Sequence, residues 1–99
     1  MPRVDTDEIK RWRNLDAAMV IVALAQHAKR DPTFIPIKDQ STTRWHVRVC
    51  DREFELLLTG PKYFDVRAEV GGGGAIDIAI HLCRIDFKAA TGLLRRVGI

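Results

Sequence analysis

The chain has 99 residues, of which 46% are hydrophobic and 29% are charged, and its formal net charge at pH 7 is +3. This length suits one domain with a single hydrophobic core, near the size at which stability becomes marginal. The sequence has no apolar run of about 18 residues, which a membrane-spanning helix would need, and no basic-then-apolar leader. We therefore expect a single domain over residues 1–99, located in the cytoplasm, with no membrane partner.

Basic residues slightly outnumber acidic ones, with sixteen Lys and Arg against thirteen Asp and Glu. This balance permits nucleic acid as a partner but does not require it. Arginine carries a planar fork suited to phosphate and to stacking on bases. The placement of the arginines is therefore more informative than the net charge.

The two cysteines, Cys50 and Cys83, have neither zinc nor redox spacing. We expect free thiols in a reducing compartment. His46 and Cys50 stand four residues apart along a predicted strand and so share a face, but structural zinc needs four nearby sulfur or nitrogen ligands. Neither a metal site nor a cofactor is expected.

An acidic run at residues 5–8 predicts the start of a helix, because carboxylates are favourable at the positive end of the helix dipole. Apolar residues recur at helical spacing after this run. We predict one helix, or two with a break near Asn14, ending by Arg30. Pro32 disfavours helical geometry at the residue before it, so residues 31–43 are expected to form a flexible loop.

Strict alternation over residues 44–49 predicts a half-buried antiparallel strand. One face carries Trp45, Val47 and Val49, and the other carries Arg44, His46 and Arg48. A reversal at residues 50–53, a return strand at 54–59 and a third strand at 63–67 complete a three-stranded or slightly larger antiparallel sheet. The expected core residues of this sheet are Trp45, Val47, Phe54, Leu56, Leu58 and Phe64.

Four consecutive glycines at residues 71–74 predict a loop, because glycine in a strand or helix interior is entropically costly. Two interpretations stay open: the glycines bring backbone N–H groups close to a phosphate, or they only allow a tight turn from a strand into a helix. The run is not a nucleotide-binding fingerprint, since no Lys-Ser or Lys-Thr pair follows it.

Two short C-terminal helices are predicted, one over residues 76–83 and one starting at Phe87. Asp77 lies in the first turn of the earlier helix, where we expect it to hold the glycine loop by accepting backbone N–H bonds. Asp86 is the expected N-cap of the later helix. The apolar stripe of that helix consists of Phe87, Ala90, Leu93 and Leu94. The fold class is therefore α+β, with a small antiparallel sheet flanked by an N-terminal helix and two short C-terminal helices.

This order of elements, with the runs Ala75-Ile76-Asp77-Ile78-Ala79-Ile80-His81-Leu82 and Ile85-Asp86-Phe87-Lys88-Ala89-Ala90-Thr91-Gly92-Leu93-Leu94, resembles the zinc-binding domain of bacterial primases. In that family a final Cys-x-x-Cys pair precedes a glycine-led helix and then an apolar-x-Phe-x-x-Ala-x-x-x-Leu segment. The likeness covers the last half of the chain well and the first half only by element order. The run from Leu56 to Asp65 is similar to zinc-less versions of the domain on plasmids and other mobile elements.

The chain departs from that family at the metal. The last two zinc-ligand positions fall near Val66 and Glu69, and neither is a thiolate. The resemblance therefore implies a zinc-ribbon-like primase domain without metal, in which a hydrophobic core supplies the stability that zinc gives its relatives.

The resemblance also implies binding of single-stranded DNA or a DNA template in a plasmid or mobile-element replication system, with polymerisation left to a separate catalytic domain. The expected nucleic-acid-binding residues are Arg44, His46, Arg48, Lys62, Tyr63, Arg67, Gly72 and Gly73. The cations would follow the phosphates while Tyr63, and Trp12 if it is exposed, stacks on bases. A simpler interpretation stays open, in which the alternating charges only solvate the outer face of a sheet.

A second function of another class stays open. The charged strand face and the 31–43 loop would then contact a protein, in a mobile-element module that inhibits or recruits a host replication or defence protein. Catalysis has little support, because no nucleophile lies beside an evident base and the acidic residues are scattered. The 99 residues also fit the N-terminal segment of a longer primase-like polypeptide.

Overall fold

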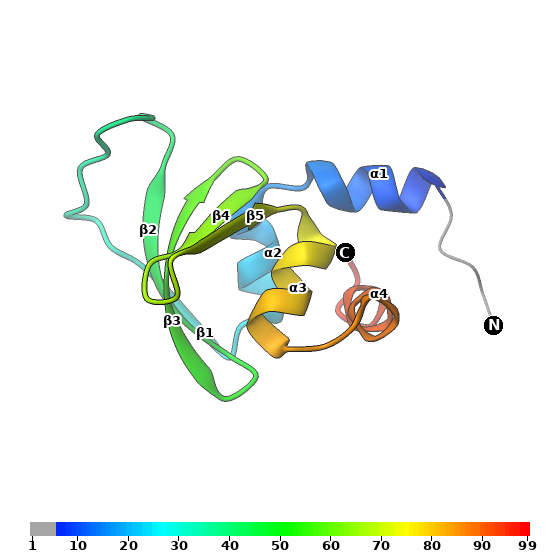
Figure 1. Ribbon diagram of the computed structural model, residues 1–99. Helices are drawn as coiled ribbons and strands as arrows, with labels where there is room; N and C mark the ends of the chain where they lie inside the picture. Colours follow the sequence, from blue (N-terminus) through cyan, green and yellow to red (C-terminus); the bar gives the residue numbers. More distant parts are fainter. Residues whose placement is uncertain (1–5) are drawn as a thin grey trace.

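The computed structural model describes residues 6–99 and shows an α+β fold (Figure 1). The elements in chain order are α1 (Thr6–Asn14), α2 (Ala17–Leu24), β1 (His27–Arg30), β2 (Thr43–Val49), β3 (Arg52–Thr59), β4 (Lys62–Asp65), β5 (Val70–Gly73), α3 (Ala75–Cys83) and α4 (Phe87–Arg96). The expected α+β class, the antiparallel sheet and the two C-terminal helices are confirmed, and the N-terminal region forms two helices with a break after Asn14. Asp5, placed in the expected helix start, lies outside the described residues. None of the helices within residues 6–99 has the length and apolar character needed to cross a membrane.

The five strands form one antiparallel sheet in the order β1-β2-β3-β4-β5. The three predicted strands are its centre, and an edge strand is added on each side. The prediction that helix continues to Arg30 is wrong, because α2 ends at Leu24 and Ala25 is already extended. The chain then pairs along β2, with His27 opposite Arg48 and Arg30 opposite Trp45. Asp31 therefore follows a strand rather than a helix.

The glycine run also differs from its prediction as a loop, because Gly71 to Gly73 belong to strand β5 and pair with β4. A Cβ placed on Gly72 would lie 1.9 Å from Oδ2 of Asp77 and 3.0 Å from the ring of Tyr63. The strand therefore needs a residue without a side chain at this position, despite the entropic cost. Gly74 alone leaves the strand, with φ of 90°, and starts α3.

Helices α2 and α3 lie against one face of the sheet, and α1 and α4 pack on α3 (Figure 1). The core forms between these helices and the sheet. The largest fully buried side chains include Trp12, Ile21, Leu56, Ile78 and Leu94. Trp12 is buried completely and its Nε1 donates to the Ile99 carbonyl at 2.8 Å, so it cannot stack on a ligand.

The expected core is correct for the central strands and wrong at Phe64. Val47, Leu56 and Leu58 are buried, and Trp45 and Phe54 pack at the edge of the core. Phe64, by contrast, is 39% exposed on the other face of the sheet, and Phe87 at the start of α4 is 49% exposed. Phe64 lies between the inward-facing Tyr63 and Asp65 on β4 and therefore points away from the core.

The β3–β4 turn anchors two helices to the sheet. The carbonyl of Gly60 accepts from the amide of Ala17 at 2.7 Å, and the carbonyl of Pro61 accepts from the amide of Gly74 at 3.0 Å. These amides belong to the first residue of α2 and to the N-cap of α3, which have no partners within their helices. One turn thus fixes where both helices begin.

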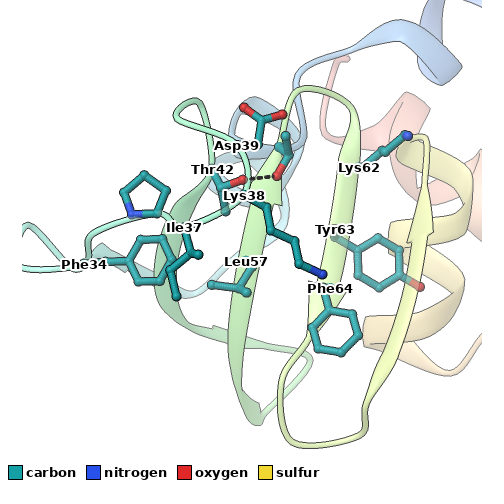
Figure 2. A pocket seen from close by; sticks show the side chains of 11 residues that line it. Phe34, Ile37, Lys38, Asp39, Thr42, Leu57, Lys62, Tyr63 and Phe64 are labelled. Atoms are coloured by element: carbon teal, nitrogen blue, oxygen red, sulfur yellow. Dashed lines mark hydrogen bonds between the residues drawn. The ribbon is translucent and has the colours of Figure 1, made fainter.

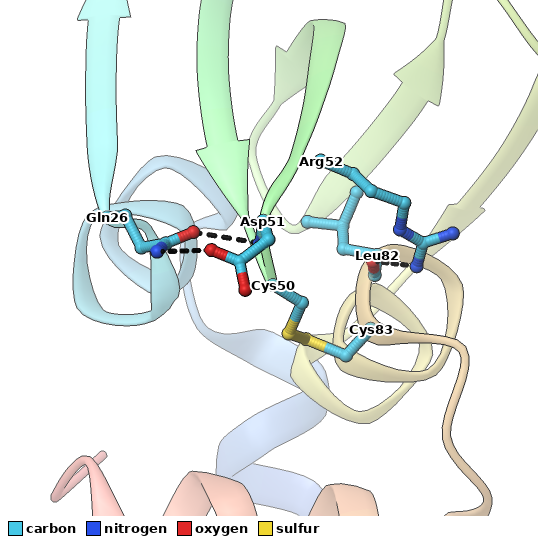
Figure 3. Close-up of a disulfide and its surroundings, with 6 residues drawn as sticks. All are labelled: Gln26, Cys50, Asp51, Arg52, Leu82 and Cys83. Carbon is cyan, nitrogen blue, oxygen red and sulfur yellow. Dashed lines mark hydrogen bonds between the residues drawn. A yellow bond between two sulfur atoms is a disulfide. The ribbon is translucent and has the colours of Figure 1, made fainter.

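Cys50 and Cys83 form a disulfide between the β2–β3 turn and the end of α3 (Figure 3). The expectation of free thiols is wrong. Cys50 and Asp51 both have positive φ, 49° and 62°, as in a type I′ hairpin turn. This turn holds the two cysteine Cα atoms 5.5 Å apart, the usual separation for a disulfide. Beside it, Arg52 donates to the Leu82 carbonyl at 2.6 Å.

We predict that the disulfide contributes substantially to stability. It closes a loop with a sequence separation of 33, and loop-closure entropy for that length corresponds to about 3–4 kcal/mol. The Cys50→Ala/Cys83→Ala variant should lose about that much unfolding free energy in urea titrations. A reducing agent should destabilise the natural chain equally and leave the variant unchanged, and a reduced chain as stable as the oxidised one would contradict the prediction.

Gly72 and Gly92 provide a matched pair of glycine substitutions. Gly72→Ala should destabilise the domain by about 2 kcal/mol or more, because the new methyl group would overlap Asp77. Gly92→Ala adds the same group within α4 where nothing lies within 4 Å, and should stabilise by roughly 0.5–1 kcal/mol. Thermal unfolding of both variants tests this, and equal effects would show that space at Gly72 is not the constraint.

Candidate functional site: the outer face of the sheet

One face of the sheet has no helix over it, and we call it the outer face. Strand alternation and register place on it the side chains of His27, Lys29, Arg44, His46, Arg48, Glu53, Glu55, Leu57, Lys62 and Phe64. The long connection between β1 and β2, residues 31–42, projects beyond the sheet on the side away from the helices (Figure 1). The predicted segregation of Arg44, His46 and Arg48 from the buried valines of β2 is confirmed.

Part of the positive charge on the outer face is balanced by two glutamates. Glu55 pairs with Arg44 and lies 3.6 Å from the guanidinium of Arg67. The hydrogen bond and charge of Arg44 hold the pKa of Glu55 below its ordinary value. His46 lies 3.9 Å from Glu53. Two of the predicted phosphate-binding arginines therefore share one carboxylate.

Other cations on this face have no such partner. Within residues 6–99, no carboxylate lies within ion-pair distance of Lys29, Arg48 or Lys62. Arg48 and Lys62 are also exposed. These side chains give the outer face its excess positive charge.

Tyr63 does not reach the outer face, and its assignment as a stacking residue does not fit the structure. Its side chain points toward the helices, is only 5% exposed and stacks on the ring of His81 with centroids 5.4 Å apart. Burial, with the nearby charges of Asp77 and Asp65, raises the pKa of Tyr63 to about 12. Tyr63 is therefore a neutral structural residue beneath the sheet.

The two glycines assigned to phosphate binding are also engaged inside the fold. The amide of Gly73 donates to Oδ2 of Asp77 at 3.0 Å, and Gly72 leaves room for that carboxylate. The expectation that Asp77 holds the glycine segment through a backbone N–H bond is confirmed. Asp86 likewise caps α4 by accepting from the amide of Ala89. The glycines serve the strand-to-helix junction.

The aromatic residue on the outer face is Phe64, which the sequence interpretation placed in the core. It lies next to Leu57, its cross-strand partner on β3. Together with Phe34 and Ile37 from the 31–42 connection, these side chains line an apolar groove with a volume of 630 Å³ (Figure 2). Alternation alone lets either Tyr63 or Phe64 face the core. Pairing across the two-residue turn at residues 60–61 decides between them, because it places Tyr63 opposite the buried Leu58.

A buried polar centre lies below the sheet where β4 ends. Asp65 is 3% exposed; its Oδ1 accepts from the amides of Arg67 and Ala68, both at 3.1 Å, and its Oδ2 lies 2.7 Å from Nε2 of His81. Burial alone would raise the pKa of Asp65, but these hydrogen bonds and the charge of His81 lower it. Asp65 is thus a carboxylate that only accepts, and His81 Nε2 is the donor.

This polar centre lies where the resemblance to primase domains would place metal. Val66 and Glu69 belong to the turn that Asp65 organises. Cys50 and Cys83 are bonded to each other in the disulfide. The described part of the chain, residues 6–99, contains no group of three or more His, Cys, Asp or Glu side chains arranged to hold a metal ion. The turn is organised by a carboxylate and a histidine instead.

Comparison with known proteins gives one distant relative. The chain is 27% identical over 97 residues to a "65 kDa protein" of Zymomonas mobilis subsp. mobilis, a match that covers 87% of this chain. It covers only 16% of the relative's length, so the relative has long regions beyond the shared one. No protein-family model matches the chain. No solved structure matches it significantly.

We predict that Asp65→Ala lowers the unfolding free energy by about 3 kcal/mol at pH 7, because it leaves buried donors without their acceptor. A carboxylate with a lowered folded-state pKa stabilises above its unfolded value of about 3.9, and this stability is lost as the pH falls through the folded pKa. The difference in unfolding free energy between the natural chain and the variant should therefore shrink below about pH 4 in urea titrations. A constant difference from pH 7 to pH 2 would contradict this assignment.

Proposed function

We propose that this domain binds single-stranded DNA through the outer face of its sheet. The observation that carries the proposal is the combination on one uncovered face of unpaired cations with an apolar groove that contains an exposed phenylalanine. Proteins that bind single strands combine a positive track for the phosphates with aromatic platforms for the bases. Charge solvation alone would not require the groove.

The structure revises the roles within this proposal. Arg44, His46, Arg48, Lys62 and Arg67 keep their place as phosphate-binding residues, with Arg48 and Lys62 the strongest because no carboxylate pairs with them. Lys29 joins them from β1. Phe64 replaces Tyr63 as the residue that stacks on a base, while Gly72 and Gly73 have structural roles.

The biological setting that we propose is a plasmid or mobile-element replication system of the primase type. The domain would not be catalytic on its own and would deliver DNA to a separate catalytic domain. The Zymomonas relative supports a modular arrangement, since the shared region is a small share of its length. A cytoplasmic location remains part of this proposal, although the disulfide removes the argument from free thiols.

A charge-reversal pair tests the face. Arg48→Glu/Lys62→Glu should weaken binding of a labelled single-stranded oligonucleotide at least tenfold in fluorescence anisotropy. The slope of log affinity against log salt should become shallower by about 0.7 for each phosphate that the variant no longer neutralises. The matched control is Lys88→Glu/Arg96→Glu, which makes the same change in net charge at exposed positions of α4. Equal losses of affinity in the two variants would show only a net-charge effect and would contradict a site on the outer face.

A protein-interaction module is the second candidate, and a specific observation favours it. Ile35 and Ile37 in the 31–42 connection are 81% and 93% exposed, which is unusual for large apolar side chains and typical of contact surfaces. An interface centred on them would be less sensitive to salt than DNA binding. If the natural chain binds no DNA at low salt, the protein-interaction module replaces DNA binding as the proposed function.

A further inference from the structure

We propose that the groove between the 31–42 connection and strands β3 and β4 holds one unpaired base of the bound DNA, stacked on Phe64. This inference rests on the proposed function and adds a defined base site to it. The groove volume of 630 Å³ lies within the range of pockets that enclose small ligands. Its walls and its charge both fit a nucleotide.

The walls of the groove are mainly apolar. Phe34 and Ile37 form one side, Leu57 lies in the floor and Phe64 forms the other side (Figure 2). Phe34 is half-buried while Phe64 is 39% exposed, so one ring supports the wall and the other offers a free surface. Every base has a π-face that stacks on such a ring, whatever its sequence.

The charge at the rim suits the phosphates on either side of that base. Lys38 and Lys62 both line the groove, and neither is ion-paired within residues 6–99. Figure 2 shows the Lys38 side chain extending over the groove toward Phe64. The one carboxylate in the lining, Asp39, is held by the amide and hydroxyl of Ser41. Cations at the rim and an apolar floor match a base with its flanking phosphates.

The wall formed by the 31–42 connection is fixed at both ends. The amide of Asp31 donates to the Arg44 carbonyl at 2.8 Å, and the hydroxyls of Thr42 and Thr59 are hydrogen-bonded at 2.6 Å (Figure 2). A wall that is already in place reduces the entropy lost when a ligand binds. The two ends of this wall are therefore held in place before a ligand binds.

The position of the groove favours a base over a peptide strand. An extended peptide that adds to a sheet needs an edge with unpaired backbone groups, whereas the groove lies over β3 and β4, which pair with each other and with neighbours on both sides. The groove thus offers side-chain stacking instead of backbone pairing. Stacking with adjacent positive charge is how single-stranded nucleic acid is held.

The test combines a change in the ring with a change in the base. Phe64→Leu keeps an apolar side chain but removes the aromatic face, and should weaken binding of oligo-dT between about 5- and 150-fold. The salt slope should stay the same, since the variant keeps every cation that faces a phosphate. With an abasic oligonucleotide of the same length, the natural chain and the variant should bind equally weakly, because the ring then has no base to contact.

Two further variants act as controls. Phe87→Leu removes an even more exposed ring on α4 and should leave the affinity unchanged. Phe34→Leu alters the supporting wall and should weaken oligo-dT binding in the same direction as Phe64→Leu. Thermal unfolding of each variant confirms that it is folded.

The outcomes separate this inference from the proposed function. If the natural chain binds oligo-dT and Phe64→Leu binds equally well, the base site is wrong and DNA binding stands. If the natural chain binds no DNA at low salt, both are wrong. If Phe64→Leu instead abolishes self-association measured by analytical ultracentrifugation, without affecting DNA affinity, the occupant of the groove is a second copy of the chain and the base site is overturned.

Discussion

The buried carboxylate of Asp65 joins the turn after β4 to helix α3. One oxygen organises the turn after β4 through two backbone amides, and the other accepts from His81 on α3. Tyr63 stacks on the same histidine. Since β5 follows the turn directly, its position beside β4 depends on this carboxylate, and so does the way α3 lies against the sheet. A neutral or missing acceptor here would leave buried donors unsatisfied.

This polar centre fixes which side of β4 faces inward, and that choice determines the character of the outer face. Tyr63 and Asp65 point toward the helices, so Phe64 between them must point outward. The exposed ring at the groove thus follows from the burial of Tyr63 and Asp65 on the opposite side of the same strand. The structural role of Asp65 and the proposed stacking role of Phe64 thus both follow from the orientation of β4.

The features that could be predicted correctly from the sequence are those that depend on residues close together in the chain. Alternation in residues 44–49 identified the two faces of β2. The roles of Asp77 and Asp86 were recognised because a carboxylate near a helix start can accept from a nearby backbone amide. Strand β1 could not be predicted in the same way. His27–Arg30 is short and mostly exposed, and its pairing with β2 depends on a partner that lies after the 31–42 connection.

Features that depend on tertiary contacts were also missed. Glycines in a strand oppose local propensity, and at Gly72 the reason is the carboxylate of Asp77 and the ring of Tyr63 beside it. The separation of 33 between the cysteines says nothing about whether they meet; the left-handed turn at Cys50 brings them together. Phe64 is the exception, because the sequence shows a two-residue turn at residues 60–61, and pairing across it places Tyr63 opposite Leu58 and turns Phe64 outward.

The disulfide has a topological consequence for the groove. It closes a covalent ring that contains β3, β4, β5 and α3, and leaves β1, β2 and the 31–42 connection outside that ring. A single peptide cleavage within the ring leaves one covalently connected molecule, whereas a cleavage in the connection separates two fragments held together only by non-covalent contacts. Leu57 and Phe64 belong to the ring, while Phe34 and Ile37 belong to the outer segment. The groove is therefore lined by two parts of the chain, one inside the covalent ring and one outside it. Its shape depends on an uncut 31–42 connection.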